Sequence, residues 1–263
     1  MKLKLDVAIS TYQPQGLQRV ADMNLPEVEG VRYVVSWQEH DGAPIPEQLL
    51  RRDVKIVRFG RSGQSANRNN SLAYTSAPIV LLSDDDLKYT ANQLKSVIDT
   101  LQANPQVQVA TFQYLGDNKH YPHTEQPITR HIPKGLTFTT FEIAVRRECL
   151  SSLKFDERFG IGGTLFDIGE DEKFMLDAVR MGYICRFFPI NITTHPGPTT
   201  GHRPITNPRA AAGTGCLIRG WYPWSWVLRI PLKAYRLKKN GSNFGFCLRH
   251  MLRGAMIDCS IVR

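Results

Sequence analysis

The sequence predicts an α/β fold, with a mostly parallel sheet flanked by helices. Three observations lead to this prediction. Short apolar runs rich in β-branched residues alternate with stretches of helical pattern, at the spacing of βαβ units. The run at residues 79–82 is continuously apolar, as in a strand buried on both faces. Soon after it come three consecutive carboxylates, Asp84, Asp85 and Asp86, at the strand end where open α/β sheets bind ligands.

The first five strands are predicted from apolar, β-branched runs. In residues 5–10, Leu5, Val7 and Ile9 alternate with smaller or polar side chains, and the pattern stops before Pro14. The other four strands are expected over residues 31–37, 54–59, 79–83 and 107–114. The helices between them are expected over residues 15–24, 65–75 and 90–104, and the last begins with a capping box, Thr90 to Gln93.

The second half of the chain has a less regular pattern. Residues 116–135 are rich in Asn, His and Pro and predict a long surface loop, which is followed by a strand pair over 136–145 and a short helix near 147–153. A helix over 168–182 opens with Glu170 and Asp171, although acidic residues in a first turn are also ordinary partners of the helix dipole. A final core strand is expected at 184–188, and a polar loop over 191–197 carries His195.

The charge of the chain is concentrated at its end. Residues 1–200 carry 22 Lys and Arg against 23 Asp and Glu, whereas residues 201–263 carry 11 Lys and Arg and one acid, Asp258. We therefore expect a neutral domain over residues 1–215 and a basic, helical tail over 216–263. An excess of this kind indicates an anionic partner for the tail, either a membrane surface or a polyphosphate.

The tail pattern predicts an amphipathic basic helix over residues 221–239, starting at or kinked by Pro231. The apolar side is expected to carry Trp221, Trp224, Leu228, Leu232 and Tyr235, and the neighbouring face Arg229, Lys233, Arg236 and Asn240. The pattern allows two interpretations of this helix. The helix lies on an anionic membrane, or it packs on the main domain and leaves a solvated basic edge.

The cysteines and the N-terminus favour a cytoplasmic protein. The five cysteines are widely spaced, odd in number and without a CxxC pair, which indicates reduced thiols rather than disulfides or a zinc site. The first residues lack the apolar core of a secretory signal, and no stretch of 18 apolar residues predicts a membrane-spanning helix.

The aspartate triplet itself indicates a cation site. Three adjacent carboxylates repel one another unless a cation lies among them, and Mg²⁺ or Mn²⁺ takes oxygen ligands from carboxylates and substrate phosphates. The plainer alternative is a solvated acidic turn at the start of a helix.

The order of these motifs resembles family-2-type glycosyltransferases, which have the GT-A fold. Leu82-Ser83-Asp84-Asp85-Asp86 is similar to their DxD motif, and Gly63-Gln64-Ser65-Ala66-Asn67-Arg68-Asn69 to the segment before it. Residues 8–12 resemble the end of their first strand, 155–159 with 169–171 resemble their acceptor segment and ED motif, and His195 stands where many members place a late metal-binding histidine. The resemblance covers roughly residues 5–200, with two departures. The acid that contacts the nucleotide base has only Glu39 or Asp41 as counterparts, and Ser83 stands where many members have an acid, which shifts the motif to the form Asp84-Asp85-Asp86.

The resemblance implies a role for each of these residues. Mn²⁺ or Mg²⁺ is expected on Asp86, with Asp84 and His195 as further ligands, and the ribose on Asp84 or Asp85. Arg68 is expected near the diphosphate, and Ser10, Thr11 and Tyr12 in the base pocket. Asp171 is the expected catalytic base, with Glu170 positioning the acceptor.

These roles predict an inverting, hexosyltransferase-type enzyme. It would move a sugar from a nucleotide-diphosphate donor, UDP-sugar by expectation, to a hydroxyl of a glycan or lipid-linked acceptor, as in cell-envelope polysaccharide assembly. The expected location is the cytoplasm, peripheral on the inner face of the cell membrane. The alternatives are a non-catalytic nucleotide- or membrane-binding module on the same fold and a sugar nucleotidyltransferase, which normally has a Gly- and Lys-rich loop after its first strand. A nucleic-acid partner is not expected, because the body is neutral and the acidic triplet repels phosphates.

Overall fold

The computed structural model describes residues 3–116, 119–197 and 204–260 of the chain. Among them, residues up to 62, 66–154 and 178–197 form one compact unit. Residues 63–65, 155–177 and those from 204 on form a second unit. The predicted boundary at residue 215 falls inside a helix of the second unit, α5 (Pro208–Trp221).

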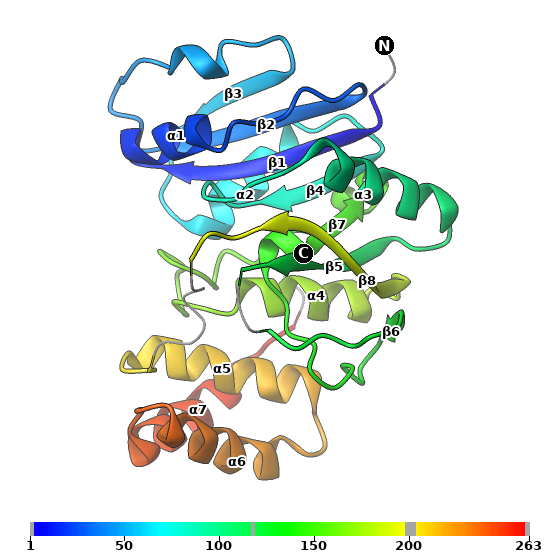
Figure 1. The fold of residues 1–263 in the computed structure, drawn as a ribbon. Coiled ribbons are helices and arrows are strands. Elements are labelled where there is room, and N and C mark those ends of the chain that lie inside the picture. Colours follow the sequence, from blue (N-terminus) through cyan, green and yellow to red (C-terminus); the bar gives the residue numbers. More distant parts are fainter. Residues whose placement is uncertain (1–2, 117–118, 198–203, 261–263) are drawn as a thin grey trace. The chain divides into compact units, whose positions relative to one another are not determined.

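The first unit is built on an eight-stranded sheet with the strand order β3-β2-β1-β4-β7-β5-β8-β6 (Figure 1). In chain order the strands are β1 (Leu5–Tyr12), β2 (Val31–Gln38), β3 (Val54–Phe59), β4 (Ile79–Ser83), β5 (Val109–Leu115), β6 (Gln126–Ile128), β7 (Ile143–Arg146) and β8 (Cys185–Thr194). β3, β2, β1 and β4 pair in parallel, as do β5 and β8. β7 runs antiparallel between β4 and β5, and β6 runs antiparallel to β8. The predicted fold class, an α/β fold with a mostly parallel sheet, is therefore confirmed.

The pairing register sets where the candidate site lies. Leu5 of β1 is level with Val31 of β2 and with Ile79 of β4, so the three strands start together. β4 ends at Ser83, opposite Ile9, and the aspartates follow directly. β1 continues three residues further, to Tyr12. The polar ends of β1 and β4 therefore meet at one edge of the sheet.

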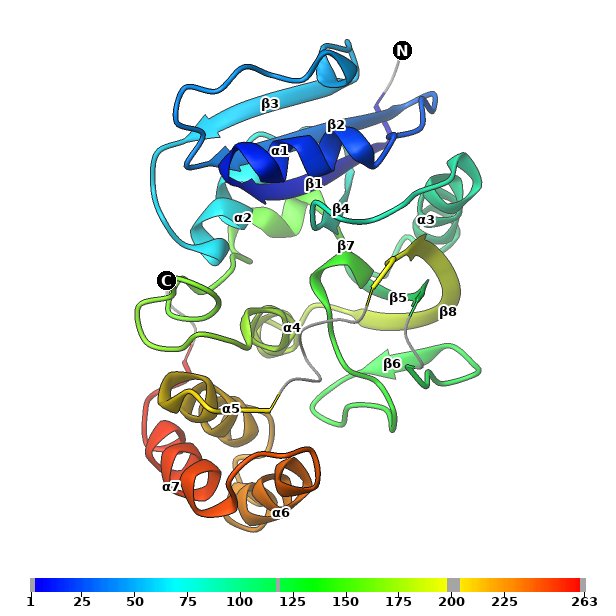
Figure 2. The same ribbon diagram turned by 60° about the vertical axis from the view of Figure 1, so that its left-hand side comes forward.

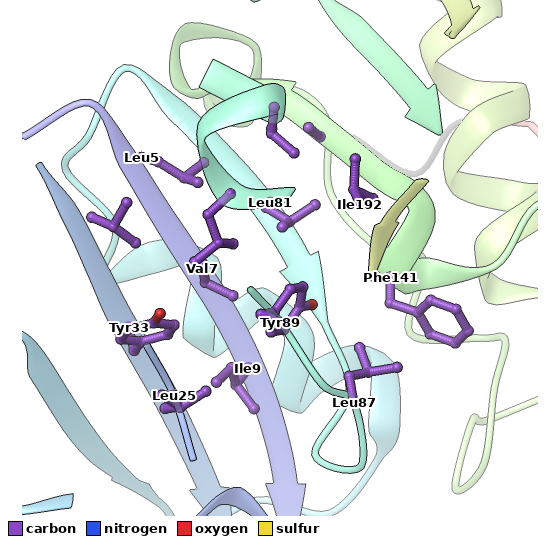
Figure 3. Close-up of a cluster of buried hydrophobic side chains, with 14 of the residues drawn as sticks. Leu5, Val7, Ile9, Leu25, Tyr33, Leu81, Leu87, Tyr89, Phe141 and Ile192 are labelled. Carbon is purple, nitrogen blue, oxygen red and sulfur yellow. The ribbon is translucent and has the colours of Figure 1, made fainter. Parts of the chain in front are cut away.

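Helices cover both faces of this part of the sheet. Alternate residues of β1, namely Leu5, Val7 and Ile9, belong to a buried cluster (Figure 3) to which α1 (Gln13–Asp22) and α3 (Ala91–Ala103) also contribute. α2 (Gln64–Ala73) lies on the opposite face, since Asn70 Nδ2 donates to Ser36 Oγ at 2.7 Å, and Ser36 alternates with the cluster residues of β2. The predicted capping box of α3 is present, with the Thr90 side chain accepting from the Gln93 N–H.

The second unit is helical. It contains most of α4 (Glu170–Arg180), then α5, α6 (Trp226–Lys239) and α7 (Phe244–Ala255), the last three of which lie together in Figure 2. α5 and α7 approach closely because glycines face the partner backbone. A Cβ on Gly215 would lie 1.9 Å from the Met251 carbonyl oxygen, and one on Gly254 would lie 1.9 Å from that of Ala212.

Several local predictions from the sequence are wrong. The strand pair over 136–145 is a 3-10 turn (Thr140–Glu142) followed by the single strand β7, whereas the short helix expected near 147–153 is present as a 3-10 helix (Arg147–Ser151). The loop over 116–135 contains β6, and β8 extends through residues 191–194, which were expected to be a loop. The tail is not one helix over 221–239: Trp221 ends α5, α6 begins at Trp226 with Pro231 inside it, and α7 follows. Among the described residues, no helix is long and apolar enough to cross a membrane.

Candidate active site

The three consecutive aspartates after β4 have three different neighbours. Asp84 pairs with Arg68, Asp85 with Arg19, and Asp86 lies beside His195. The strand end beneath them is anchored by the buried Tyr89, whose hydroxyl donates to Ser83 Oγ at 2.9 Å (Figure 3 shows the ring among the core side chains). The mutual repulsion of the carboxylates is thus partly offset by two guanidinium groups, Arg68 of α2 and Arg19 of α1.

Asp85 is the most tightly held of the three. Its carboxylate accepts from Thr11 Oγ1 at 2.6 Å and from Arg19 Nη2 and Nε at 2.8 and 3.1 Å. Gly16 of α1 makes this arrangement possible, because a Cβ there would lie 2.2 Å from Thr11 Oγ1 and 3.0 Å from Asp85 Oδ2. The ends of β1 and β4 are therefore joined through Asp85.

Asp84 is held from the other face of the sheet. Arg68 lies almost fully buried in α2, and its Nη2 donates to Asp84 Oδ1 at 3.0 Å. The neighbouring Asn67 donates to the Thr11 carbonyl oxygen at 2.8 Å, which fixes α2 against the end of β1. The Asp84 side chain remains partly open to solvent, more so than that of Asp85.

Asp86 is the most exposed of the three carboxylates and lies 3.6 Å from His195 Nε2. Burial and then the negative charge of Asp84 raise the pKa of Asp86, while His195 acts in the opposite direction. A carboxylate in this position gains from an added cation, because a cation offsets both the burial and the repulsion.

His195 is brought to Asp86 by the end of β8. Thr194 and Lys88 exchange two backbone hydrogen bonds of 2.9 Å, and the His195 N–H donates to the Leu115 carbonyl oxygen at 2.8 Å. The imidazole stacks on Phe141, and its Nδ1 contacts the backbone of Gly197. When Nδ1–H donates to the Gly197 carbonyl oxygen, Nε2 carries the lone pair on the side of Asp86.

Asp86 and His195 together suit a divalent cation. A carboxylate oxygen and an imidazole nitrogen are both ordinary ligands of Mn²⁺, and the remaining positions of such an ion are commonly filled by phosphate oxygens and water. Within the described part of the chain, no group of three or more His, Cys, Asp or Glu side chains is arranged to hold an ion by itself. Asp86 and His195 therefore supply two ligands of the kind that such an ion takes.

The end of β1 has unused polar groups. Ser10 Oγ is buried without a hydrogen-bond partner among the described residues, while Thr11 is engaged with Asp85. The exposed Tyr12 hydroxyl hydrogen-bonds Glu39, which raises the pKa of Tyr12. Glu39 and Asp41 have positive φ angles of 48° and 47°, and they line a hollow of about 220 Å³ beside β3. A buried hydroxyl without a protein partner is able to hydrogen-bond a polar ligand.

Glu170 and Asp171 belong to the second unit, in the first turn of α4. Both side chains are half-buried. Gly160, with a φ of 93°, brings its backbone next to Glu170, and a Cβ there would lie 3.3 Å from the carboxyl group. Farther along the helix, Lys173 is fully buried between Asp156, at 3.2 Å, and Asp177. The roles of Glu170 and Asp171 as positioning group and base stay predictions.

Sequence reasoning missed three residues of this site. Arg19 lies on an exposed turn of α1 and Phe141 in the irregular segment before β7, and neither stands in a recognisable motif. Glu142 is a buried carboxylate that accepts from Lys119, Tyr121 and Thr139, which ties the segment after residue 118 to β7. An isolated acid between apolar residues at 141 and 143 was the only available signal.

Comparisons with known proteins bear on these observations. Residues 43–163 match the family model described as "Glycosyl transferase family 2". No curated protein sequence matches the chain significantly.

Among solved structures, the chain is similar to TarS from S. aureus, residues 1–349. The ligand-free form superposes with a TM-score of 0.58 and 14% identity over 97% of this chain and 92% of that one. The complex with UDP-GlcNAc gives 0.57 and 14% over 95% and 91%. The complex with UDP gives 0.54 and 16% over 83% of this chain and 64% of that one. At these identities the likeness shows the fold, which confirms the expected GT-A architecture.

Proposed function

We propose that this chain, whose residues 43–163 match the family-2 glycosyltransferase model, transfers a sugar from a nucleoside diphosphate donor to an acceptor hydroxyl, with inversion at the anomeric carbon. The proposed donor is a UDP-sugar. TarS, a protein of similar fold, has been solved in complex with UDP and with UDP-GlcNAc, and these complexes support a UDP-sugar as the donor.

One observation carries the donor proposal: Asp86 lies beside His195, while Arg68 and Arg19 hold the other two aspartates. This arrangement leaves one carboxylate available to a cation and two guanidinium groups close to the place where a diphosphate would lie. Arginine is well suited to phosphate because its planar donors match the phosphate oxygens. A site with both signs of charge suits a metal-bound diphosphate better than either component alone.

In this proposal, different residues of the first unit bind different parts of the donor. Asp86 and His195, with Asp84 as a further ligand, would hold Mn²⁺ or Mg²⁺, which would supply positive charge for the leaving diphosphate. Ser10, Thr11 and Tyr12 line the base pocket, with Glu39 or Asp41 at its rim. The ribose is assigned to Asp84 or Asp85, of which Asp84 has the more exposed side chain.

Asp171 is the proposed general base. Its carboxylate takes the proton of the acceptor hydroxyl as the acceptor oxygen bonds to the anomeric carbon. The bond from that carbon to the diphosphate oxygen breaks, and the nucleoside diphosphate leaves with the electron pair. Attack opposite the leaving group converts an α-linked donor into a β-linked product. Glu170 orients the acceptor.

The proposed acceptor is a glycan or a lipid-linked glycan at the inner face of the cell membrane. The concentration of positive charge in residues 201–263, which hold 11 Lys and Arg and one acid, supports this location.

The donor site is tested by thermal shift with UDP, GDP, CDP and dTDP, each with and without Mn²⁺. A ligand at 100 times its Kd stabilises the native state by about 2.7 kcal/mol, which is easily measured. We expect a Mn²⁺-dependent shift with UDP that is lost in Asp86→Ala and kept in Asp99→Ala, which removes an exposed acid of α3. A Mn²⁺-dependent shift with only another nucleotide would replace the UDP assignment, and no shift with any of the four would refute the donor site.

The base is tested separately with Asp171→Asn. We expect the variant to keep the nucleotide shift but to lose transfer by a factor of about 10² or more, as is typical for a general base. Transfer at the normal rate by Asp171→Asn would show that another group takes the proton. Asp99→Asn is the matched control and should leave both measurements unchanged.

A further inference from the structure

Helix α6 has two apolar lines, and only one of them is covered. Ile230 and Ala234 are fully buried in a cluster with residues of α7. The second line is open to solvent: Trp224, just before the helix, is 97% exposed and Leu228 is 77% exposed. It continues along the helix with the half-exposed side chains Val227, Leu232 and Tyr235.

The exposed side chains fall on one side of the helix. At about 100° per residue, Val227, Leu228, Leu232 and Tyr235 span roughly 140° of the helix surface. Ile230 and Ala234 lie outside this span, which agrees with their burial against α7. A contiguous row of exposed apolar side chains indicates an interaction surface, whereas single exposed apolar side chains are common on any protein surface. We call the line from Trp224 to Tyr235 the outer stripe.

Positive charge borders the outer stripe. Arg229, Lys233 and Arg236 are exposed and lie between the stripe and the buried line, while Lys238 and Lys239 are exposed at the end of the helix. Arg229 also lies over the Tyr222 ring, 3.7 Å from its centroid. From residue 204 to residue 257 the chain has no Asp or Glu, so no acid of this segment neutralises the surface.

The charge argues against a second copy of the chain as the occupant. A two-fold contact brings each patch against itself, so Arg229, Lys233 and Arg236 would face the same cations of the other copy. An anionic lipid surface instead offers phosphate groups to the cations and hydrocarbon to the stripe. An indole ring next to apolar side chains and Lys or Arg is the composition of helices that lie in the membrane interface.

We propose that α6 docks this protein on an anionic membrane, with the outer stripe entering the headgroup boundary and the flanking Arg and Lys binding lipid phosphates. The inference deepens the proposed function and rests on it only for the location of the acceptor. The buried line on α7 gives the docking helix a fixed support in the same compact unit.

Vesicle sedimentation with the full chain tests the proposal. Vesicles of phosphatidylcholine with 30% phosphatidylglycerol are compared with phosphatidylcholine alone, where about 30% is the chosen anionic fraction. We expect binding to the anionic vesicles, a weak signal with neutral ones, and a loss of the anionic binding at high salt. Equal binding to both vesicle types, or to neither, would overturn the proposal.

Matched variants separate the apolar and the ionic contributions. Leu228→Ser should lower the partition coefficient about tenfold, and the control Leu50→Ser, at another exposed leucine, should leave it unchanged. Removing three of the positive charges beside the outer stripe should lower the partition coefficient about a hundredfold. Removing three exposed positive charges of the first unit should leave the partition coefficient unchanged. The test variant is Lys233→Gln/Arg236→Gln/Lys239→Gln, and its control is Arg52→Gln/Lys95→Gln/Lys154→Gln.

Tryptophan fluorescence gives a local readout. Trp37 and Trp221 are buried and Trp226 is partly buried, so Trp224 should supply the blue shift and the quenching by brominated lipid. Both signals should disappear in Trp224→Phe. Persistence of the quenching in that variant would show that another surface docks, and self-association in place of vesicle binding would identify a second copy as the occupant.

The nucleotide thermal shift, measured in parallel, distinguishes the two proposals. Vesicle binding without a nucleotide shift would refute the donor site and leave the docking surface standing. A nucleotide shift without vesicle binding would refute the docking surface alone.

Discussion

Replacing Lys173 by methionine should destabilise the second unit strongly. The ammonium is fully buried, lies 3.2 Å from the Asp156 carboxylate and contacts Asp177 one turn along α4. Methionine keeps most of the aliphatic volume, so the variant removes the charge without opening a large cavity. The Asp177 carboxylate then stays buried without the ammonium of Lys173, whereas Asp156 keeps its hydrogen bonds from Arg158.

The magnitude follows from the burial of all three groups. Breaking a buried ion pair by removing one partner costs about 3–5 kcal/mol, because the remaining charge loses its compensation. Arg158 compensates Asp156, so most of this cost arises at Asp177. With an m-value of about 3 kcal/mol/M in urea, the unfolding midpoint should fall by about 1–1.7 M. The double variant Lys173→Met/Asp177→Asn should recover most of the loss, since it removes the buried carboxylate charge that Lys173 no longer offsets.

The assay is equilibrium unfolding in urea at pH 7, followed by far-UV circular dichroism. Lys95→Met, an exposed lysine of α3, is the control and should change stability by no more than about 0.5 kcal/mol. A midpoint for Lys173→Met within about 0.3 M of the wild type, or no recovery in the double variant, would refute the reasoning about the buried charges.

Three further predictions concern the site and the second unit. Burial acts to raise the pKa of Asp156, but the hydrogen bonds from Arg158 and the charge of Lys173 lower this pKa on balance. The contribution of Asp156 to stability should therefore be present above about pH 4 and be lost as the pH falls through the lowered pKa. Urea unfolding at a series of acidic pH values checks this prediction, and stability that rises on acidification would contradict it. Arg19→Ala should weaken Mn²⁺-dependent nucleotide binding several-fold, because it releases the Asp85 carboxylate. The variant should lose less than about 1 kcal/mol of stability, since the Arg19 side chain is half exposed. An unchanged Kd for the nucleotide, measured by calorimetry, would show that Asp85 does not need Arg19. Gly215→Ala should destabilise the α5–α7 contact by about 1–3 kcal/mol, since its Cβ would meet the Met251 carbonyl oxygen, and an unchanged melting temperature would disprove this packing argument.

The sheet could be predicted closely where each strand is determined by its own residues. β3 and β4 have the predicted bounds, and α3 begins at the predicted cap Thr90, because apolar runs and capping boxes are local signals. Prediction failed at residues 136–145, where one short strand is inserted antiparallel between β4 and β5. That pairing depends on neighbours about 35 and 65 residues away, which local patterns do not report.

In the candidate site too, features encoded by local sequence were predicted and contacts between distant segments were not. The triplet Asp84, Asp85 and Asp86 and the late His195 were recognised from their order in the chain, and Asp86 does lie beside His195. The partner of Asp85 could not be foreseen. Arg19 reaches it only because β1 and β4 are neighbours in the sheet and Gly16 leaves room for the contact.

The tail helix was foreseen as amphipathic, but not which side of it is covered. Leu228 and Ile230 are equally apolar in the sequence, yet α7 buries only Ile230. The sequence by itself determined the fold class and the side chains available at the end of β4, because these depend on residue type and short-range order. The tertiary structure alone decided which cation meets which carboxylate and which apolar side chains stay exposed, because both depend on distances between segments far apart in the chain.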